Sequence, residues 1–495
     1  MARFGFTGSS YSPQVQSLDA QDLINFYFEP DESGAGKSQG ALCPTPGLSL
    51  FSTLSGTKNR GIFTINGLLF SAVGSSLYQI DSAGVATNLG PIGNDGNPVS
   101  MAASPTQVAI ASSGTLYCYN INTHVLSTPA GLLGNVSQCE FCDGYFIALL
   151  KDTQKFQISA LEDATSWDAL DIAQISVFSD NILSMKVDHR EIWFYGLKET
   201  QVYYNSGNAD FPFDVVASGF IEQGCSAEFS PVRLDNSVFW LGGDERGARV
   251  AWRANGYTPT RVSNYAVEYA WSRYSTVSDA VAYAYQDQGH SFWQITFPTA
   301  NATWVYDAST GQWFKKGFWN TLTSSYDMHR SLDHAYCFNK HLVGDSKSGN
   351  IYEMNISNYT DFNNLIRRMR RAPYVSKAGE YITFSSFELM MDTGLALQGA
   401  DATPPVQGSN PVVSLRWSDD NGRTWSNPVQ MSAGTVGQYS TRMFARRLGK
   451  CWGSIGRVFE VVVSDPVAWR LCDADLIASD YQSQERLASL VRKTA

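Results

Sequence analysis

The chain has 495 residues with 36 basic and 46 acidic side chains, and its formal net charge of −10 excludes a protein that grips DNA with its whole surface. Aromatic residues reach 13%, charged residues only 17%, and 41 glycines punctuate the chain. This composition predicts an all-β protein of many short strands joined by tight turns, and the length suits a large repeat domain with additions.

The first predicted element is an extended N-terminal arm over residues 1–58. It holds the run from Pro30 to Ser38, followed by Cys43-Pro-Thr-Pro-Gly47. Proline, glycine and serine at this density favour an extended chain over a packed core. Such an arm lies either against a neighbouring subunit or as a strap along its own domain. No signal peptide follows Met1, and no stretch approaches the ~20 apolar residues of a membrane helix, so we expect no membrane anchor.

A repeated unit occupies residues 59–358. Each copy has an apolar strand, a turn, a second apolar strand and then an aliphatic–aromatic pair or a weaker version of it. The second members of these pairs are Tyr78, Tyr117, Phe156, Tyr203, Ala251, Tyr306 and Tyr352, spaced 39–55 residues apart. This spacing brackets the roughly 40–50 residues of one four-stranded propeller blade. Because only a neighbouring sheet buries the faces of each unit, the repeat predicts a closed β-propeller of six or seven blades.

An arginine-rich link is predicted over residues 359–373, where the run from Asp361 to Arg371 interrupts the repeat. Residues 374–476 are predicted to form a separate β-sandwich-like domain. Alternation of side chains from Val458 to Val463, for example, suits a sandwich strand with one wet face. Residues 477–495 form a polar C-terminal tail, either a short helix or loose chain.

One motif in the predicted sandwich is specific. The segment Ser418-Asp-Asp420-Asn-Gly422-Arg-Thr424-Trp425 matches the Asp-box pattern at every fixed position. Its turn permits positive φ, the tryptophan folds over the turn, and a carboxylate caps the amides. In sialidases such boxes stabilise hairpins away from catalysis. A sialidase would also need a Tyr–Glu pair, an acid and three arginines. No Arg-rich motif precedes the blades, so we predict a structural Asp-box and no catalytic residues.

Three weaker patterns predict neither a cofactor nor a metal site. The segment Gly34-Ala-Gly-Lys-Ser38 imitates a phosphate-binding loop, but Asp31 stands where its first glycine belongs. Cys139 and Cys142 have metal-ligand spacing without a second pair, and strand alternation places them on opposite faces. The histidines, among them His329, His334 and His341, show no fixed spacing. Eight irregularly spaced cysteines predict reduced thiols in a protein made in a cytoplasm.

Two basic clusters are candidates for contact with another molecule. They are Arg367, Arg368, Arg370 and Arg371, and then Arg442, Arg446, Arg447 and Lys450. Either cluster suits DNA phosphate or an acidic partner surface. The alternative is a solvated face or a contact between the two domains. Because the whole chain is acidic, we expect a protein rather than DNA as the partner.

Several segments together resemble a known family. They are Asn25-Phe-Tyr-Phe-Glu29, Pro44-Thr-Pro-Gly47, Trp304-Val-Tyr-Asp307, Gly311-Gln-Trp313, the run Arg367 to Arg371, the Asp-box, Arg446-Arg-Leu-Gly449 and Val461-Val-Val-Ser-Asp-Pro466. This set is similar to the packaged-DNA stabilisation proteins, also called tail hub or nozzle proteins, of short-tailed bacteriophages. The resemblance covers nearly the whole chain.

The resemblance implies a structural protein of the virion tail, made in the host bacterial cytoplasm. Six copies are expected to form a ring below the portal and its adaptor. That ring retains packaged DNA, carries a needle, fibre or tailspike protein below it, and conducts DNA through its lumen at ejection. Two alternatives from other classes are a receptor- or glycan-binding propeller on the virion and a sialidase-like glycosidase.

Overall fold

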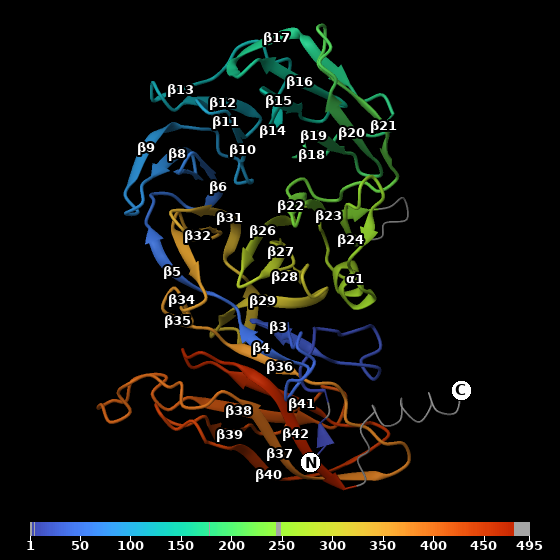
Figure 1. Ribbon diagram of the computed structural model, residues 1–495, viewed down its shortest axis with the longest axis vertical. Coiled ribbons are helices and arrows are strands. Elements are labelled where there is room, and N and C mark those ends of the chain that lie inside the picture. Colours follow the sequence, from blue (N-terminus) through green and yellow to red (C-terminus); the bar gives the residue numbers. More distant parts are fainter. Residues whose placement is uncertain (1, 4, 178, 244–248, 480–495) are drawn as a thin grey trace.

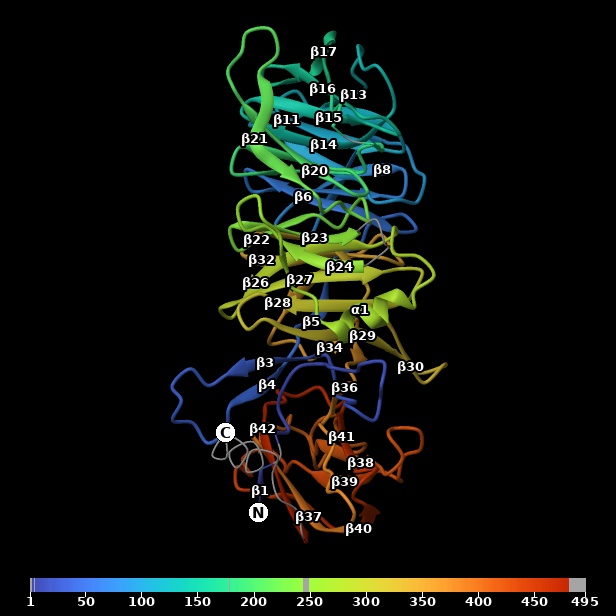
Figure 2. The same ribbon diagram turned by 90° about the vertical axis from the view of Figure 1, so that its right-hand side faces the viewer.

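The computed structural model describes residues 2–3, 5–177, 179–243 and 249–479. Within them the chain is nearly all β, with 42 strands and one α-helix, α1 (Tyr265–Ser272). A ring of sheets forms one end of an elongated molecule, and a two-layered β domain forms the other (Figures 1 and 2). None of the described segments is a helix long and apolar enough to cross a membrane.

The ring contains seven four-stranded antiparallel sheets, the blades, and six of them are built from consecutive strands. Blade 1 comprises β6 (Asn59–Ile65), β7 (Leu68–Val73), β8 (Ser76–Ile80) and β9 (Ala86–Pro91). Blade 2 comprises β10 (Ser100–Ala103), β11 (Gln107–Ser112), β12 (Thr115–Asn120) and β13 (Val125–Ser127). Blade 3 comprises β14 (Val136–Cys142), β15 (Tyr145–Leu150), β16 (Lys155–Ala160) and β17 (Asp163–Gln174). Blade 4 comprises β18 (Ser184–Asp188), β19 (Glu191–Tyr195), β20 (Thr200–Asn205) and β21 (Phe213–Ile221). Blade 5 comprises β22 (Val232–Leu234), β23 (Ser237–Gly243), β24 (Arg249–Arg253) and β25 (Thr260–Arg261). Blade 6 comprises β26 (Val281–Asp287), β27 (His290–Phe297), β28 (Ala302–Asp307) and β29 (Gln312–Asn320), with β30 (Ser325–Met328) beside β29.

Blade 7 takes its outermost strand from the other end of the propeller sequence. Its strands are β31 (Ser331–Cys337), β32 (Lys340–Asp345), β33 (Ile351–Asn355) and β5 (Gly47–Ser52). The antiparallel pairing of β5 with β33 completes the last sheet with a strand that precedes the first blade. A ring joined in this way leaves only short, protected edges.

The expected propeller is confirmed and has seven blades. All seven marker pairs lie on the third strand of a blade, from Leu77-Tyr78 on β8 to Ile351-Tyr352 on β33. The aromatic member packs between neighbouring sheets. Tyr203 on β20, for instance, contacts the rings of Phe156 and Phe194 in the core shared by blades 3 and 4. The repeat spacing therefore reports the interval between blade cores.

The expected sandwich after the propeller is also confirmed. One of its sheets comprises β36 (Arg368–Arg371), β41 (Val458–Val463), β38 (Val412–Ser418) and β39 (Val429–Ser432), and the other comprises β3 (Phe26–Pro30), β4 (Gly40–Pro44), β42 (Leu471–Ser479), β37 (Tyr381–Met391) and β40 (Met443–Trp452), with β1 (Ala2–Arg3) beside β42. Rings of Phe384 and Phe387 on β37 meet Phe459 on β41 between the two sheets. This contact lies at the centre of the sandwich core.

The described residues of the segment 1–58, which was predicted as an extended arm, lie along their own chain, so the strap is the form that the structure has. Besides β3, β4 and β5, this segment contains β2 (Asp22–Ile24), which pairs with β29 of blade 6 and with β36 of the sandwich. The reason is apolar burial, because Phe6, Leu23, Phe26 and Leu42 are at most 1% exposed. Each such side chain contributes about 1.5–3 kcal/mol, which outweighs the local preference of the proline- and glycine-rich runs.

The predicted link and tail also contain sheet structure. Within residues 359–373, β36 belongs to the sandwich, and the short strands β34 (Thr360–Asp361) and β35 (Asn364–Leu365) extend the sheet of blade 7 beyond β5. At the other end, β42 continues to Ser479, three residues past the expected end of the sandwich. Residues 480–495, the rest of the predicted tail, lie outside the described residues.

Candidate functional site

An axial cavity of about 480 Å³ lies at the centre of the propeller. The first strand of every blade contributes to its wall, from β6, β10 and β14 through β18 and β22 to β26 and β31 (Figure 1). Its volume falls in the range of small-molecule pockets. Duplex DNA, whose major groove alone is about 12 Å wide, does not fit such a space. The axis of one propeller is therefore no passage for a genome.

Charged side chains of both signs line this cavity. Lys186 Nζ lies 2.5 Å from Glu140 Oε1, and Lys58 also lines the cavity. Burial raises the pKa of Glu228 to about 7 and that of Asp333 to about 6. These two carboxyl groups therefore take up protons near neutral pH more readily than exposed carboxyls do.

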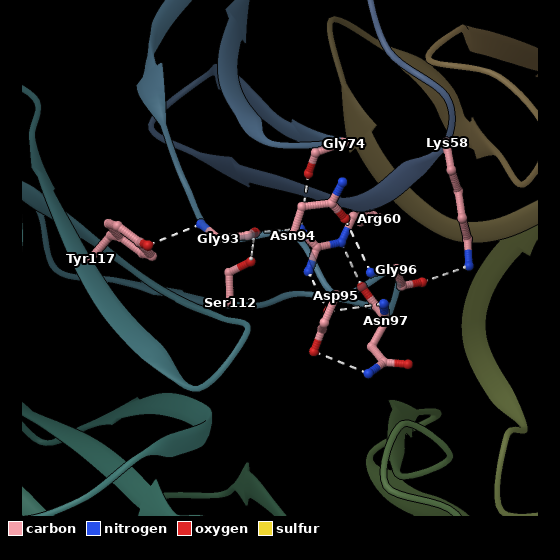
Figure 3. Close-up of polar contacts among 10 residues, drawn as sticks. All are labelled: Lys58, Arg60, Gly74, Gly93, Asn94, Asp95, Gly96, Asn97, Ser112 and Tyr117. Carbon is pink, nitrogen blue, oxygen red and sulfur yellow. Dashed lines mark hydrogen bonds and ion pairs between the residues drawn. The ribbon is translucent and has the colours of Figure 1, made fainter.

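Arg60 near the start of β6, which lines the axial cavity, holds the loop of residues 93–97 (Figure 3). Its side chain is almost fully buried and donates to the carbonyl oxygens of Gly74 (2.9 Å), Gly93 (2.7 Å) and Asn97 (2.7 Å), while Nη2 pairs with Asp95 (2.9 Å). These contacts fasten the connection between blades 1 and 2. Sequence reasoning missed this residue, although a lone arginine heading an apolar strand is a usable signal for a buried clamp.

The Asp-box forms the hairpin between β38 and β39. Asp420 Oδ1 accepts hydrogen bonds from the amides of Arg423 (3.0 Å) and Thr424 (2.8 Å), and Oδ2 accepts one from Thr424 Oγ1 (2.6 Å). Ser418 Oγ donates to the same carboxylate and accepts from the amide of Gly422, whose φ of +81° suits glycine. The bonds from Thr424 come first among those that lower the pKa of Asp420 to about 2. All of these contacts stay within the hairpin, which is a structural arrangement.

Two members of the first arginine cluster are buried inside the molecule. Arg368 and Arg370 on β36 are both 0% exposed. Arg370 donates to three oxygens of the N-terminal segment, which are Phe6 O (2.7 Å), Ser9 O (3.0 Å) and Gln21 Oε1 (2.7 Å). Burial lowers the pKa of each arginine to about 10, which leaves both charged at neutral pH. Neither side chain can reach another molecule.

The other two arginines of this cluster make contacts within the chain. Arg371 Nη2 lies 2.8 Å from Glu460 Oε2, and Arg416 Nε donates to Glu460 Oε1 (2.6 Å). Both guanidinium groups lie over the ring of Trp425, at 4.9 and 4.6 Å. Arg367 lies 4.2 Å from the centre of the Trp319 ring, which belongs to blade 6. The cluster thus joins the sandwich to the Asp-box and to the propeller.

The second basic cluster lies on the surface of the sandwich. All four residues are exposed: Arg442 directly precedes β40, and Arg446, Arg447 and Lys450 lie on it. Arg442 forms a 2.6 Å ion pair with Glu388 on the neighbouring strand β37. For the other three, the described part of the chain shows no ion pair. Of the two predicted clusters, this one has the accessibility that contact with another molecule requires.

The remaining sequence motifs form local turns and core packing. In the loop that imitates a phosphate site, Asp31 Oδ2 accepts from the amide of Gly36 (2.6 Å), so the chain's own carboxylate occupies the turn. Cys139 packs in the core between blades 2 and 3 and Cys142 in the core between blades 3 and 4, and burial raises the pKa of each thiol to about 12. The two thiols face away from each other and cannot share a metal.

Two of the three histidines, His334 and His341, lie together on blade 7, and His329 precedes its first strand. His334 Nε2 lies 3.0 Å from His341 Nδ1, and burial lowers the pKa of His334 to about 3. His329 is buried beside Ser331. Among the described residues, no group of three or more His, Cys, Asp or Glu side chains is arranged to hold a metal ion.

Comparison with known proteins gives two family matches in chain order. The profile described as "Bacteriophage P22 Gp10, beta-propeller" matches residues 7–359, and the profile described as "Bacteriophage P22 Gp10, beta-sandwich" matches residues 367–476. No curated protein matches the chain.

Three solved structures are similar at low identity. The computationally designed Ika8 protein is 12% identical over 68% of this chain and 100% of its own, with a TM-score of 0.38. The N-terminal domain of Nup159 is 11% identical over 68% and 99%, with a TM-score of 0.42. The WD40 β-propeller domain of Doa1 is 12% identical over 62% and 96%, with a TM-score of 0.41. Similarities of this size carry no information about function.

Proposed function

The chain belongs to the bacteriophage P22 Gp10 family of structural phage tail proteins, and we propose that six copies form a ring in the tail of a short-tailed phage. The ring docks below the portal or its adaptor, retains the packaged DNA, carries a needle, fibre or tailspike protein, and conducts DNA at ejection. The observation that carries this proposal is the pair of family matches, which together reach from residue 7 to residue 476 in the order of the two domains.

Retention in this proposal is mechanical. Residues 59–358 contain 17 basic and 28 acidic side chains, so the propeller repels phosphate more than it attracts it. The axial cavity of about 480 Å³ is too small for a duplex. DNA therefore passes through the lumen between subunits, where a like-charged wall leaves it free to move once the tail opens.

The protein acts without catalysis and without a cofactor in this proposal. Support comes from the Asp-box, where the hydrogen bonds of Asp420 are internal to the hairpin, and from the ion pair between Lys186 and Glu140 in the axial cavity. A receptor- or glycan-binding propeller on the virion is the alternative function. It makes a different prediction about particles that lack the protein.

The test is to produce particles from a phage in which this gene is deleted, with the wild-type gene on a plasmid as the control. We expect the deletion particles to package DNA and then lose it. The measurement is the fraction of DNA that stays protected from nuclease over time, with electron micrographs of filled and empty heads. Complemented particles should keep their DNA.

A different result would favour the alternative. If deletion particles keep their DNA as long as complemented ones do and fail only to adsorb to the host, the retention role is wrong. Deleting only residues 1–40 is a poor substitute for the full deletion, because that change also removes β2 and β3 from the sheets that join the two domains.

A further inference from the structure

The strand β40 is the edge of its sandwich sheet, and a bulge changes which of its side chains are exposed. Its pairing with β37 shifts register between Phe384 and Ser386, and Arg447 has a φ of +59°. In a regular strand, consecutive side chains point to opposite faces. The bulge instead leaves both Arg446 and Arg447 exposed. A bulged, positively charged edge also discourages the addition of a further strand, so a partner meets side chains here rather than backbone.

Aromatic rings accompany these cations. Arg446 lies 4.8 Å from the centre of the Phe444 ring, and Lys450 lies 5.2 Å from that of Tyr381. Tyr381 in turn meets Trp452 edge to face at 4.9 Å. Tyr381 is 58% exposed and Trp452 40% exposed, so their apolar surface remains open to solvent. We call the surface formed by Tyr381, Phe444, Arg446, Arg447, Lys450 and Trp452 the β40 face.

The β40 face lies in the part of the chain with the opposite charge balance from the propeller. Residues 367–476 contain 13 basic and 10 acidic side chains, against the 17 basic and 28 acidic ones of residues 59–358. Both views show β37 and β40 at the end of the long axis that is farthest from the upper blades (Figures 1 and 2). A surface at this end is better placed to contact a protein stacked along the long axis than to contact a neighbour that lies beside the propeller.

We propose that the β40 face is a docking surface for the acidic, partly apolar surface of another tail protein that stacks on the sandwich end of this chain. Arginine and exposed aromatic rings are enriched at protein interfaces, where the rings fill apolar pockets and the cations meet carboxylates. Duplex DNA offers phosphates but no apolar pocket for Tyr381 and Trp452 at its backbone. The inference rests on the proposed place of the chain in a tail.

The first experiment reverses the charge of the face. Deletion phage is complemented with the full chain carrying Arg446→Glu, Arg447→Glu and Lys450→Glu, and all tail proteins in the purified particles are quantified. We expect either this chain or one protein attached to it to fall by about tenfold or more, since like charges facing each other across an interface cost several kcal/mol. The matched control, Lys151→Glu, Lys155→Glu and Lys347→Glu, makes the same charge change on exposed sites of the propeller.

A second variant separates the apolar contribution from the charge. Tyr381→Ser with Trp452→Ser keeps all three cations and should lower the same tail protein, because a protein interface loses its anchors when the rings are removed. The purified variants must keep the thermal midpoint and the oligomeric state of the wild-type chain, so that a loss in particles reports docking. Binding of each purified chain to a duplex DNA fragment is measured in parallel at the same ionic strength.

Three results would overturn the proposal. One is a normal set of tail proteins in particles that carry the charge-reversed face, and another is an equal loss in the propeller control. The third is duplex binding by the wild-type chain that the charge reversal abolishes and the serine variant retains, which identifies DNA as the occupant. Each result is independent of whether deletion particles retain DNA, so the docking surface and the retention role can fail separately.

Discussion

The arginines of β36 and those of β40 belong to one sandwich but to opposite environments. Arg370 on β36 is 0% exposed, and oxygens of the N-terminal segment accept its hydrogen bonds. Arg446 on β40 is exposed, and its guanidinium lies 4.8 Å from the centre of the Phe444 ring. The difference lies in what covers each strand. The N-terminal segment lies against β36 and places oxygen atoms beside its arginine, whereas β40 is an edge. A cluster of arginines therefore indicates structure or recognition according to the acceptors that the fold brings to it.

The largest expected effect comes from breaking the buried side of this comparison. Arg370→Met removes three hydrogen bonds of a charged group, which are those to the carbonyl oxygens of Phe6 and Ser9 and to Gln21 Oε1. At about 1.5–3 kcal/mol for each bond, we expect a loss of about 5 kcal/mol in the free energy of unfolding. Denaturant unfolding followed by tryptophan fluorescence measures it. Arg446→Met is the control and should change the unfolding midpoint little. Equal losses of stability in the two variants would contradict the difference between the buried and the exposed arginine.

The next effect concerns the ion pairs beside β36. Glu460 is 1% exposed and pairs with both Arg371 and Arg416. Glu460→Gln keeps the shape but removes the charge, and we expect a loss of about 2 kcal/mol because two partly buried cations lose their counter-charge. The matched control is Glu388→Gln, whose partner Arg442 is 64% exposed. Solvent screens that pair, so its loss should be much smaller. A loss at Glu388 as large as that at Glu460 would show that burial does not set the difference.

Arg367 tests the comparison further, because its side chain is half-buried. Its guanidinium lies over the Trp319 ring at 4.2 Å, across the boundary between sandwich and propeller. Arg367→Ala should cost about 1 kcal/mol, the size of one partly desolvated cation–π contact. Arg367→Lys should recover part of that loss. The measurement is the same unfolding experiment, and a loss as large as that of Arg370→Met would be inconsistent with this contact.

The smallest effect is confined to the Asp-box hairpin. Asp420→Asn should speed hydrogen exchange at the amides of Arg423 and Thr424, because the carboxylate that accepts from them is lost. In the wild-type chain the pKa of Asp420 is lowered from 3.8 to about 2. The contribution of this group is therefore complete above about pH 4 and is lost as pH falls toward 2. Unchanged protection of both amides at neutral pH in the variant would show that the carboxylate does not cap the turn.

A propeller was predictable because the third strand of most blades carries an aliphatic–aromatic pair that fills the space between two sheets. The weaker copies at Lys155-Phe156 and Val250-Ala251 left six and seven blades both open. Tyr203 shows the reason, since its position is dictated by neighbours within the repeat. The N-terminal strands could not be predicted in the same way. Ile24 pairs with Lys315 and Met369, partners that lie about 300 residues away and leave no local pattern. The alternation of apolar and polar residues along a strand also does not show which arginines will be covered by a segment that is distant in sequence.

The pairing of β5 with β33 makes completion of the propeller a matter of timing during synthesis. The ribosome makes Ser52 roughly 300 residues before Asn355, which at about 5–20 residues per second is a delay of about 15–60 s. Throughout that interval β5 has no partner in blade 7, and β2 waits still longer for β36. A chain released before residue 351 can stack six blades but has no way to fasten the seventh. Translation of β33 is thus the step that allows a row of sheets to become a closed ring.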